Sequence, residues 1–204
     1  MDLILATRNQ GKIRELERMF RDLDFDVRVL GLNAFPEVGS LSEPGRTFWE
    51  NAWHKASTVC RLTGLPALAD DSGLEVDALN GAPGVFSARY SKEGASDQEN
   101  NEKLLQDLAD TPSQQRTARF RCQLVACLPG GETLSAEGVW EGWIGFEPKG
   151  DNGFGYDPLF VDKETGLTAA QMPARDKNAR SHRAEALKRF VRAWPEFVRK
   201  LKNR

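Results

Sequence analysis

Histidine and cysteine are scarce in this chain of 204 residues, which holds two histidines and three cysteines. With only His54 and His182 available, a zinc or iron centre built on several histidines is all but excluded. Cys60, Cys122 and Cys127 fit no metal-binding spacing, and their odd number leaves one thiol over, so we expect free, buried thiols and a reducing compartment. Any metal must therefore be bound by carboxylates, which favours Mg²⁺ or Mn²⁺.

Long hydrophobic runs are also lacking. No window approaches the ~20 apolar residues that a membrane-spanning helix needs. The first residues, MDLILATRNQ, have no basic segment ahead of an apolar run of signal-peptide length. We therefore expect a soluble, cytoplasmic protein without a membrane partner. A hydrophobic content of 40% is enough for one sizeable globular domain, or a domain with a modest lobe.

Positive charge is concentrated at the end of the chain. The formal net charge is −2, yet residues 175–204 alone carry +8, which leaves −10 for residues 1–174. A basic segment of this kind suits a nucleic acid, a small molecule that bears phosphates, or simply a solvated helix face. The charge pattern leaves these three interpretations open.

Hydrophobic spacing predicts an α/β fold. Ile13, Leu16, Phe20 and Leu23 recur at helical spacing, and a capping box from Ser96 to Glu99 opens a later helix. Strands are expected at 3–6, 26–32, 67–69, 117–128 and 133–144. Further helices are expected at 47–64 and after Ser181, and we expect the last helix to be interrupted or restarted near Pro195. The last two strands alternate like antiparallel neighbours, so we expect a mixed sheet. Residues 147–158 are too rich in Gly, Pro and Asp for regular structure.

The loop TRNQGK, from Thr7 to Lys12, connects the first strand to the first helix. Gly11 allows close approach of the backbone, and a helix start offers unpaired N–H groups that suit a phosphate. Many α/β loops share these properties, so the loop alone is a weak signal.

Two adjacent aspartates, Asp70 and Asp71, follow the short apolar run of residues 67–69. Neighbouring carboxylates repel each other unless a cation, a hydrogen-bond network or water compensates. Their place predicts the C-terminal end of a strand, where open α/β sheets carry their sites. We therefore expect a ligand beside this pair and Ser72.

Familiar motifs do not explain the pair. RNQGKI lacks the first glycine and the Ser/Thr of a P-loop, GFGYDP is no dinucleotide fingerprint, and there is no Gly-x-Ser-x-Gly elbow. The remaining carboxylates and donors form a set suited to phosphoryl transfer: Glu37, Glu43, Glu75 and Asp77 with Thr7, Asn9, Lys12, Lys55, Lys177 and Arg183. Each has an ordinary alternative as a turn former, a helix cap or a solvated residue. The residues alone lead as far as an Mg²⁺-dependent nucleotide or phosphate enzyme.

Five segments taken in order resemble the inosine/xanthosine triphosphate pyrophosphatase family. They are LATRNQGKIREL, TFWENAWHKA, LPALADDSGLEVDALNGAPGVFSARY, GFGYDPLF and KNARSHRAEAL, and they span nearly the whole chain. The resemblance implies one domain, residues 1–204, with two lobes around an active-site cleft and a long central mixed sheet flanked by helices. It also implies a homodimer that hydrolyses ITP, dITP or XTP to the monophosphate and pyrophosphate with Mg²⁺.

The resemblance also implies roles for individual residues. Asp71 would bind metal and activate water as the base, and Ser72 would touch the substrate beside it. The triphosphate would be held by Thr7, Arg8, Asn9, Gln10, Gly11, Lys12 and Lys55. The base and sugar would meet Phe154, Gly155, Tyr156 and Asp157, and the 6-oxo edge of the purine would be recognised by Lys177, His182 and Arg183.

Two positions depart from the family pattern. Arg8 stands where the family loop usually has glycine, so it either adds a phosphate contact or points away. The acidic pair expected before the second helix is Ser42-Glu43, which makes Glu43 our choice for the second metal ligand and Glu37 the substitute. A pyrophosphatase for modified pyrimidine nucleotides is disfavoured by the SHR segment, and a nucleic-acid-binding protein by the acidic loops, so we expect no nucleic-acid partner.

Overall fold

The computed structural model describes residues 1–23, 25 and 27–202, with the side chains of residues 200–202 left out of the description. The chain forms two compact units. Unit 1 comprises Met1–Asp71, Cys122–Gly138 and Arg183–Arg204, and unit 2 comprises Ser72–Arg121 and Val139–His182. We describe each unit by itself.

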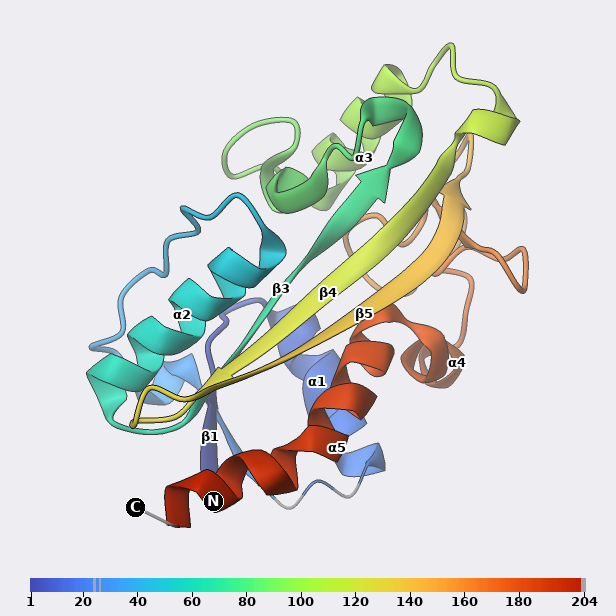
Figure 1. Cartoon of the computed structure of the whole chain (residues 1–204). Coiled ribbons are helices and arrows are strands. Elements are labelled where there is room, and N and C mark those ends of the chain that lie inside the picture. The colour runs from blue at the N-terminus through green and yellow to red at the C-terminus, as the bar shows by residue number, and fades with distance from the viewer. Residues whose placement is uncertain (24, 26, 203–204) are drawn as a thin grey trace. The chain divides into compact units, whose positions relative to one another are not determined.

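In the described part of the chain, six strands form one sheet in the order β2-β1-β3-β4-β5-β6 (Figure 1). The strands are β1 (Asp2–Leu5), β2 (Arg28–Gly31), β3 (Ala67–Val76), β4 (Thr117–Cys127), β5 (Thr133–Ile144) and β6 (Phe160–Asp162). β1 pairs in parallel with β2 and β3, whereas β5 and β6 are antiparallel. The predicted α/β fold with a mixed sheet flanked by helices is confirmed. Residue 26 of the predicted second strand lies outside the described residues.

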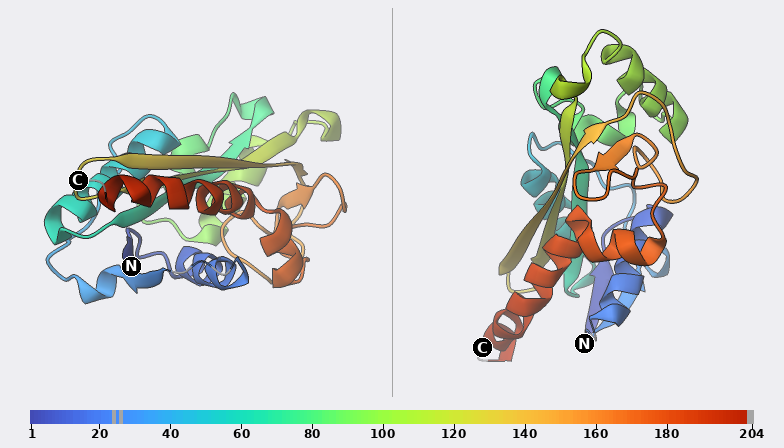
Figure 2. Two further views of the ribbon diagram at one scale, coloured as in Figure 1. Left: turned by 60° about the horizontal axis from the view of Figure 1, so that its bottom comes forward. Right: turned by 90° about the vertical axis from the view of Figure 1, so that its right-hand side faces the viewer.

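Three helices cover the two faces of the sheet in unit 1. They are α1 (Gln10–Asp22), α2 (Phe48–Thr63) and α5 (His182–Lys202). α1 and α5 lie on one face of the sheet and α2 lies on the other (Figures 1 and 2). Successive strand residues point to opposite faces, so Leu3 and Leu5 pack with α1 and α5, whereas Ile4 and Ala6 pack with α2. The residues that follow β1 therefore emerge between two helical layers.

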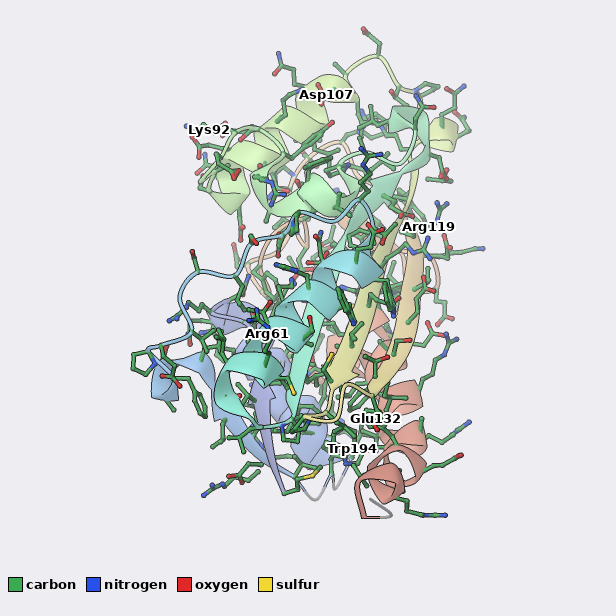
Figure 3. All side chains as sticks on the ribbon, turned by 60° about the vertical axis from the view of Figure 1, so that its left-hand side comes forward. Arg61, Lys92, Asp107, Arg119, Glu132 and Trp194 are labelled. Carbon is green, nitrogen blue, oxygen red and sulfur yellow. The ribbon has the colours of Figure 1, made fainter. Side chains whose placement is uncertain are left out.

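The boundaries of α2 follow local rules. Thr47 and Glu50 form a complete capping box at the N-terminus, and Gly64 ends the helix in the left-handed conformation at φ 68°. The predicted helix over 47–64 is confirmed. Ala52 faces the core, whereas Arg61 lies on the outer side of the helix (Figure 3).

The last helix corrects one prediction, because α5 continues through Pro195 without the expected interruption. Proline removes one N–H from the helix interior. Trp194 and Phe197, whose ring centroids lie 5.6 Å apart, are nevertheless both buried in the core of unit 1, and this packing favours continuation of the helix (Trp194 is labelled in Figure 3). The apolar face of α5, including Phe190, is buried in the core of unit 1. This packing favours the solvated-face interpretation for the exposed basic residues of the helix, such as Lys188 and Arg189.

Unit 2 is built around a second core that includes Phe120, Trp140 and Phe160. Its helices are α3 (Asp97–Asp107), with the predicted capping box from Ser96 to Glu99, and α4 (Ala174–Arg180). The short 3-10 helices of the chain are η1 (Leu32–Ala34), η2 (Asp77–Leu79), η3 (Gly84–Arg89) and η4 (Ser113–Gln115). Residues 147–158 are irregular, as predicted. The three described cysteines are free and buried, also as predicted, and none of the described helices is long and apolar enough to cross a membrane.

We expect Gly142→Ala to destabilise the protein, because Gly142 allows β6 to approach β5. A Cβ at this position would lie 2.2 Å from the carbonyl oxygen of Val161, whereas at the matched control Gly145 its nearest neighbour lies at 3.5 Å. Gly142→Ala should lower the free energy of unfolding by about 1–3 kcal/mol, the range for forced overpacking. Gly145→Ala should change it by less than ~0.5 kcal/mol. Urea unfolding of both variants tests this, and equal midpoints would contradict the close approach.

Candidate functional site

The aspartate pair lies in the middle of β3, which corrects the prediction that it ends a strand. The strand continues because Leu74 and Val76 are buried and extend the alternating pattern. The strand that does end here is β1, whose pairing with β3 reaches only Leu68. The pair therefore lies just beyond the carboxyl end of β1.

Asp70 and Asp71 point to opposite faces of β3, since successive side chains of a strand alternate. Lys12 and Arg183, from α1 and α5, bind Asp70, whereas Lys55 from α2 binds Asp71. The repulsion expected between adjacent carboxylates is thus relieved by separation, and each carboxylate has its own cation.

Asp70 is completely buried in a network of donors. Arg183 Nε and Cys122 Sγ each donate to Asp70 Oδ2 at 3.1 Å, and the Lys12 ammonium pairs with Oδ1. Burial alone would raise the pKa of Asp70, but Lys12 and Arg183 outweigh it and hold that pKa well below its usual value. Arg183 Nη1 also binds Glu15 Oε2 at 3.0 Å. Asp70 is therefore a fixed negative charge that orients two cations.

Asp71 is buried on the α2 side and shares a lysine with Glu43. Lys55 Nζ donates to Asp71 Oδ1 at 2.7 Å and to Glu43 Oε1 at 2.9 Å. Asn51 Nδ2 donates to the other carboxylate oxygen of Asp71 at 3.3 Å. Burial raises the pKa of Asp71 against the opposing effect of Lys55, and Glu43 adds to the rise. A carboxylate with a raised pKa and a fixed orientation suits a general base.

The loop from Thr7 to Lys12 forms the start of α1. Asn9 caps the helix by accepting from Lys12 N at 3.1 Å, and Thr7 Oγ1 accepts from Asn9 N at 3.2 Å. Gln10 and Gly11 form the first turn. The loop therefore places a helix N-terminus and the Lys12 ammonium together, which suits an anion.

Arg8, the departure from the family pattern, turns toward the segment that precedes α2. Its Nη2 donates to the carbonyl oxygen of Val38 at 2.6 Å. Both segments belong to unit 1, so Arg8 connects the Thr7–Lys12 loop to the chain that leads to Glu43.

The carboxylates fit a hard divalent cation. Among the described residues, no three His, Cys, Asp or Glu side chains converge as a metal cluster. Mg²⁺ does not need one, because it commonly uses one or two carboxylates together with water and substrate phosphates. The Lys55 ammonium already lies between Asp71 and Glu43 as a stand-in cation, whereas Glu37 is exposed. Of the two expected second ligands, Glu43 is the one that shares a cation with Asp71.

A second group of predicted residues meets in unit 2. Lys177 Nζ and Asp157 Oδ2 form a buried ion pair at 2.6 Å. The same carboxylate oxygen accepts from Phe154 N at 2.9 Å, and the Lys177 ammonium lies 5.1 Å from the centre of the Phe154 ring. Tyr156 is anchored through its hydroxyl, which donates to Ser87 O at 2.8 Å. These contacts fix the half-buried ring of Phe154 beside the Lys177 ammonium.

His182 is buried in the aromatic core of unit 2. Its ring stacks on Phe120 with centroids 4.8 Å apart and an angle of 14°, and on Trp140 at 6.4 Å. Ser72, the first residue of unit 2, is half-buried on β3. Both residues thus lie in regular, well-packed elements.

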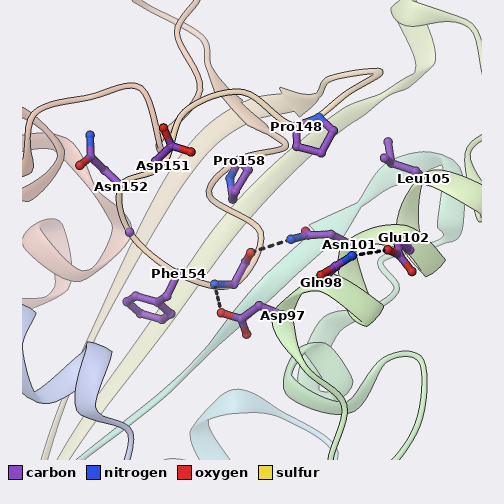
Figure 4. Close-up of a pocket in the computed structure, with 12 residues that line it drawn as sticks. Asp97, Gln98, Asn101, Glu102, Leu105, Pro148, Asp151, Asn152, Phe154 and Pro158 are labelled. Atoms are coloured by element: carbon purple, nitrogen blue, oxygen red, sulfur yellow. Dashed lines mark hydrogen bonds between the residues drawn. The ribbon is translucent and has the colours of Figure 1, made fainter.

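A pocket of about 430 Å³ lies between α3 and the loop that contains Phe154 (Figure 4). Asp97 accepts from Gly155 N at 2.6 Å, and Asn101 donates to Gly155 O at 2.9 Å, so α3 clamps the loop backbone (Figure 4). Asp97, Glu102 and Asp151 all line the pocket. Their carboxylates would repel phosphates, so this side of the loop is unsuited to a triphosphate.

Two partners that fix the predicted residues, Glu15 and Cys122, were not predicted from the sequence. Glu15 binds Arg183 and lies three residues after Lys12, on the same face of α1, so helical spacing could have indicated it. Cys122 binds Asp70 across 52 residues of sequence, and no local pattern points to that contact.

Comparisons with known proteins identify the family of the chain. The model of the Ham1 family matches residues 3–193. A dITP/XTP pyrophosphatase of Nitratidesulfovibrio vulgaris is 54% identical over 203 residues, covering 97% of each chain. A protein of the same name from Streptococcus pneumoniae is 48% identical over 199 residues, covering 97% of this chain and 98% of that one.

Solved structures give the same result. A HAM1 protein from Coxiella burnetii has a TM-score of 0.87 at 41% identity and covers 96% of this chain and 99% of that one. A nucleoside-triphosphatase / dITP/XTP pyrophosphatase from Mycobacterium abscessus has a TM-score of 0.77 at 42% identity, with 93% and 98% covered. On this agreement of sequence and fold, the chain belongs to the Ham1 family.

Proposed function

We propose that this chain hydrolyses the nonstandard purine nucleoside triphosphates ITP, dITP and XTP to the monophosphate and pyrophosphate, and that the reaction depends on Mg²⁺. Its family makes it a nucleoside-triphosphate pyrophosphatase, and the names of its relatives support nonstandard nucleotides as substrates. The reaction would remove deaminated purines from the nucleotide pool.

One observation carries the proposal: Asp71 and Glu43 share a cation beside the Asp70–Lys12 ion pair at the start of α1. This arrangement provides carboxylates for a metal and donors for phosphates within one compact unit. Phosphoryl transfer needs both, because the charge on the phosphate oxygens must be neutralised while water is activated.

In this proposal the Thr7–Lys12 loop and Lys55 bind the triphosphate. Asp71 and Glu43 would hold Mg²⁺, which when bound shields the phosphate charge and makes water more acidic. Asp71 accepts the proton of the attacking water, a role that its raised pKa supports. The anhydride between the α- and β-phosphates is hydrolysed, and pyrophosphate leaves.

We assign the nucleoside to the aromatic and cationic residues that the family resemblance indicates. Phe154 stacks on the base, while Lys177, His182 and Arg183 donate to the 6-oxo edge. Adenine presents an amino group at that edge, so donors would face donors and ATP would be rejected. Leaving buried polar groups unpaired in this way can discriminate by ~10⁴ or more.

The remaining expectations about the protein's setting are also part of the proposal. The following properties stay predictions: a single domain with a cleft, a homodimer, a cytoplasmic location, and the absence of nucleic-acid and membrane partners.

Pyrophosphate release from ITP, dITP, XTP, ATP and GTP, measured with Mg²⁺ and with EDTA, tests the function directly. We expect rapid release from the first three, little from ATP, and none with EDTA. Guanine shares the 6-oxo edge, so low release from GTP would mean that its 2-amino group is excluded. Equal hydrolysis of ATP would refute recognition of the 6-oxo edge, and activity in EDTA would refute the metal.

The role of Asp71 is tested by Asp71→Asn. The amide cannot accept the proton, so kcat for ITP should fall by ~10²–10⁴-fold or more, the contribution of a positioned base. Nucleotide binding, measured by calorimetry, should remain detectable. Asp110→Asn, at an exposed aspartate, is the control and should turn over normally. Undiminished turnover by Asp71→Asn would mean that the carboxylate is structural.

Stacking by Phe154 is tested by Phe154→Ala. Loss of about 1–3 kcal/mol of base stacking should raise KM for ITP by ~5–150-fold and change kcat much less. Phe146→Ala removes a ring that is 62% exposed in the same unit and should leave KM unchanged. If both variants behave alike, Phe154 does not contact the base.

A further inference from the structure

Three oxygen atoms surround the Lys55 ammonium, much as oxygen ligands would surround a bound metal ion. The ammonium has three donors, and they meet Asp71 Oδ1 at 2.7 Å, Glu43 Oε1 at 2.9 Å and the backbone oxygen of Asp70 at 3.0 Å. The side chain is only 7% exposed. Two carboxylates and a carbonyl thus surround one buried positive charge.

The same oxygen atoms are typical ligands of a hard divalent cation. Mg²⁺ binds carboxylate oxygens at about 2.0–2.1 Å, which is closer than the ammonium approaches them. The ammonium and the metal are both cations, so they would repel each other strongly within one buried set of oxygens. The two cannot occupy this position together.

We propose that Lys55 is the resident cation of the metal-free protein, and that a divalent ion displaces its Nζ, which then binds the phosphate oxygens of the nucleotide. The inference rests on the metal site of the proposed function. It assigns to Lys55 a competition with the metal, in addition to phosphate binding.

Asn51 allows this exchange to occur without disturbing the carboxylate. It donates to Asp71 Oδ2, whereas Lys55 binds Oδ1, so one oxygen stays anchored when the ammonium leaves. Asn51 Oδ1 is in turn fixed by Gly45 N at 2.7 Å. Asp71 would thus keep its orientation in both states.

The exchange has a thermodynamic consequence. Without nucleotide, a metal ion that binds must displace the Lys55 ammonium, which then loses its three oxygen contacts and gains no equally favourable ones. A triphosphate supplies that destination, so metal and nucleotide should each strengthen the binding of the other, and by equal factors.

The test is metal binding to metal-stripped protein without nucleotide, with Mn²⁺ as the probe and the EPR signal of free Mn²⁺ as the readout. Lys55→Gln removes the competing charge and should bind Mn²⁺ at least tenfold more tightly than the unaltered protein. Lys55→Arg keeps the charge and should not gain affinity. Lys92→Gln, at a lysine that is 63% exposed, controls for the loss of any lysine and should match the unaltered protein.

Stability offers a second readout, because Lys55→Gln leaves two carboxylates without their cation. Its melting temperature should be low without metal and should rise on Mn²⁺ addition by more than that of the unaltered protein. If Lys55→Gln does not fold without metal, Lys55→Ala, which leaves room for water beside the carboxylates, is the second variant. Recovery of its circular dichroism on Mn²⁺ addition then tests the same competition.

The coupling is measured with an ITP analogue that has a methylene bridge between the α- and β-phosphates. In the unaltered protein this analogue should strengthen Mn²⁺ binding by a larger factor than in Lys55→Gln. Equal or weaker Mn²⁺ binding by Lys55→Gln and Lys55→Ala would overturn the inference while leaving the metal site intact. Failure of the unaltered protein to bind Mn²⁺ even with the analogue would instead refute the proposed function.

Discussion

The alternation of side chains along β3 is the constraint on which the rest of the candidate site depends. Because Asp70 and Asp71 are adjacent in a strand, they must point to opposite faces, and each recruits cations from the helices on its own side. α1 and α5 supply Lys12 and Arg183, and α2 supplies Lys55. One dipeptide thereby ties three helices of unit 1 to the sheet and also brings together polar groups that are proposed to bind a triphosphate.

The two carboxylates have opposite electrostatic characters despite being neighbours. Asp70 has no exposure to solvent and its two cations keep it ionised, so it serves as a fixed support. Asp71 is slightly more exposed and shares one lysine with a second carboxylate, and burial leaves its pKa raised. Environment, and not residue type, therefore separates the supporting role of Asp70 from the chemical role proposed for Asp71.

Local sequence patterns predicted most elements of the fold, and tertiary packing decided the rest. The helix 47–64 carries its own capping box and its own glycine stop, so its limits were visible in the sequence. β6 has three residues and α4 has seven, which is too short for either periodicity to show. The motifs located Asp71 and Lys55, but the contact from Cys122 to Asp70 depends on β4 lying next to β3, and no local pattern encodes that.

Cys122 contributes an uncharged hydrogen-bond donor to the network around Asp70. Burial, and the neighbouring charge of Asp70, raise the pKa of its thiol well above the usual value, so it stays protonated. The thiolate is the form that peroxides and alkylating reagents attack, and a buried neutral thiol escapes both. The sulfur atom beside Asp70 therefore acts as a neutral hydrogen-bond donor, which holds Asp70 Oδ2 in place without adding a charge to the network.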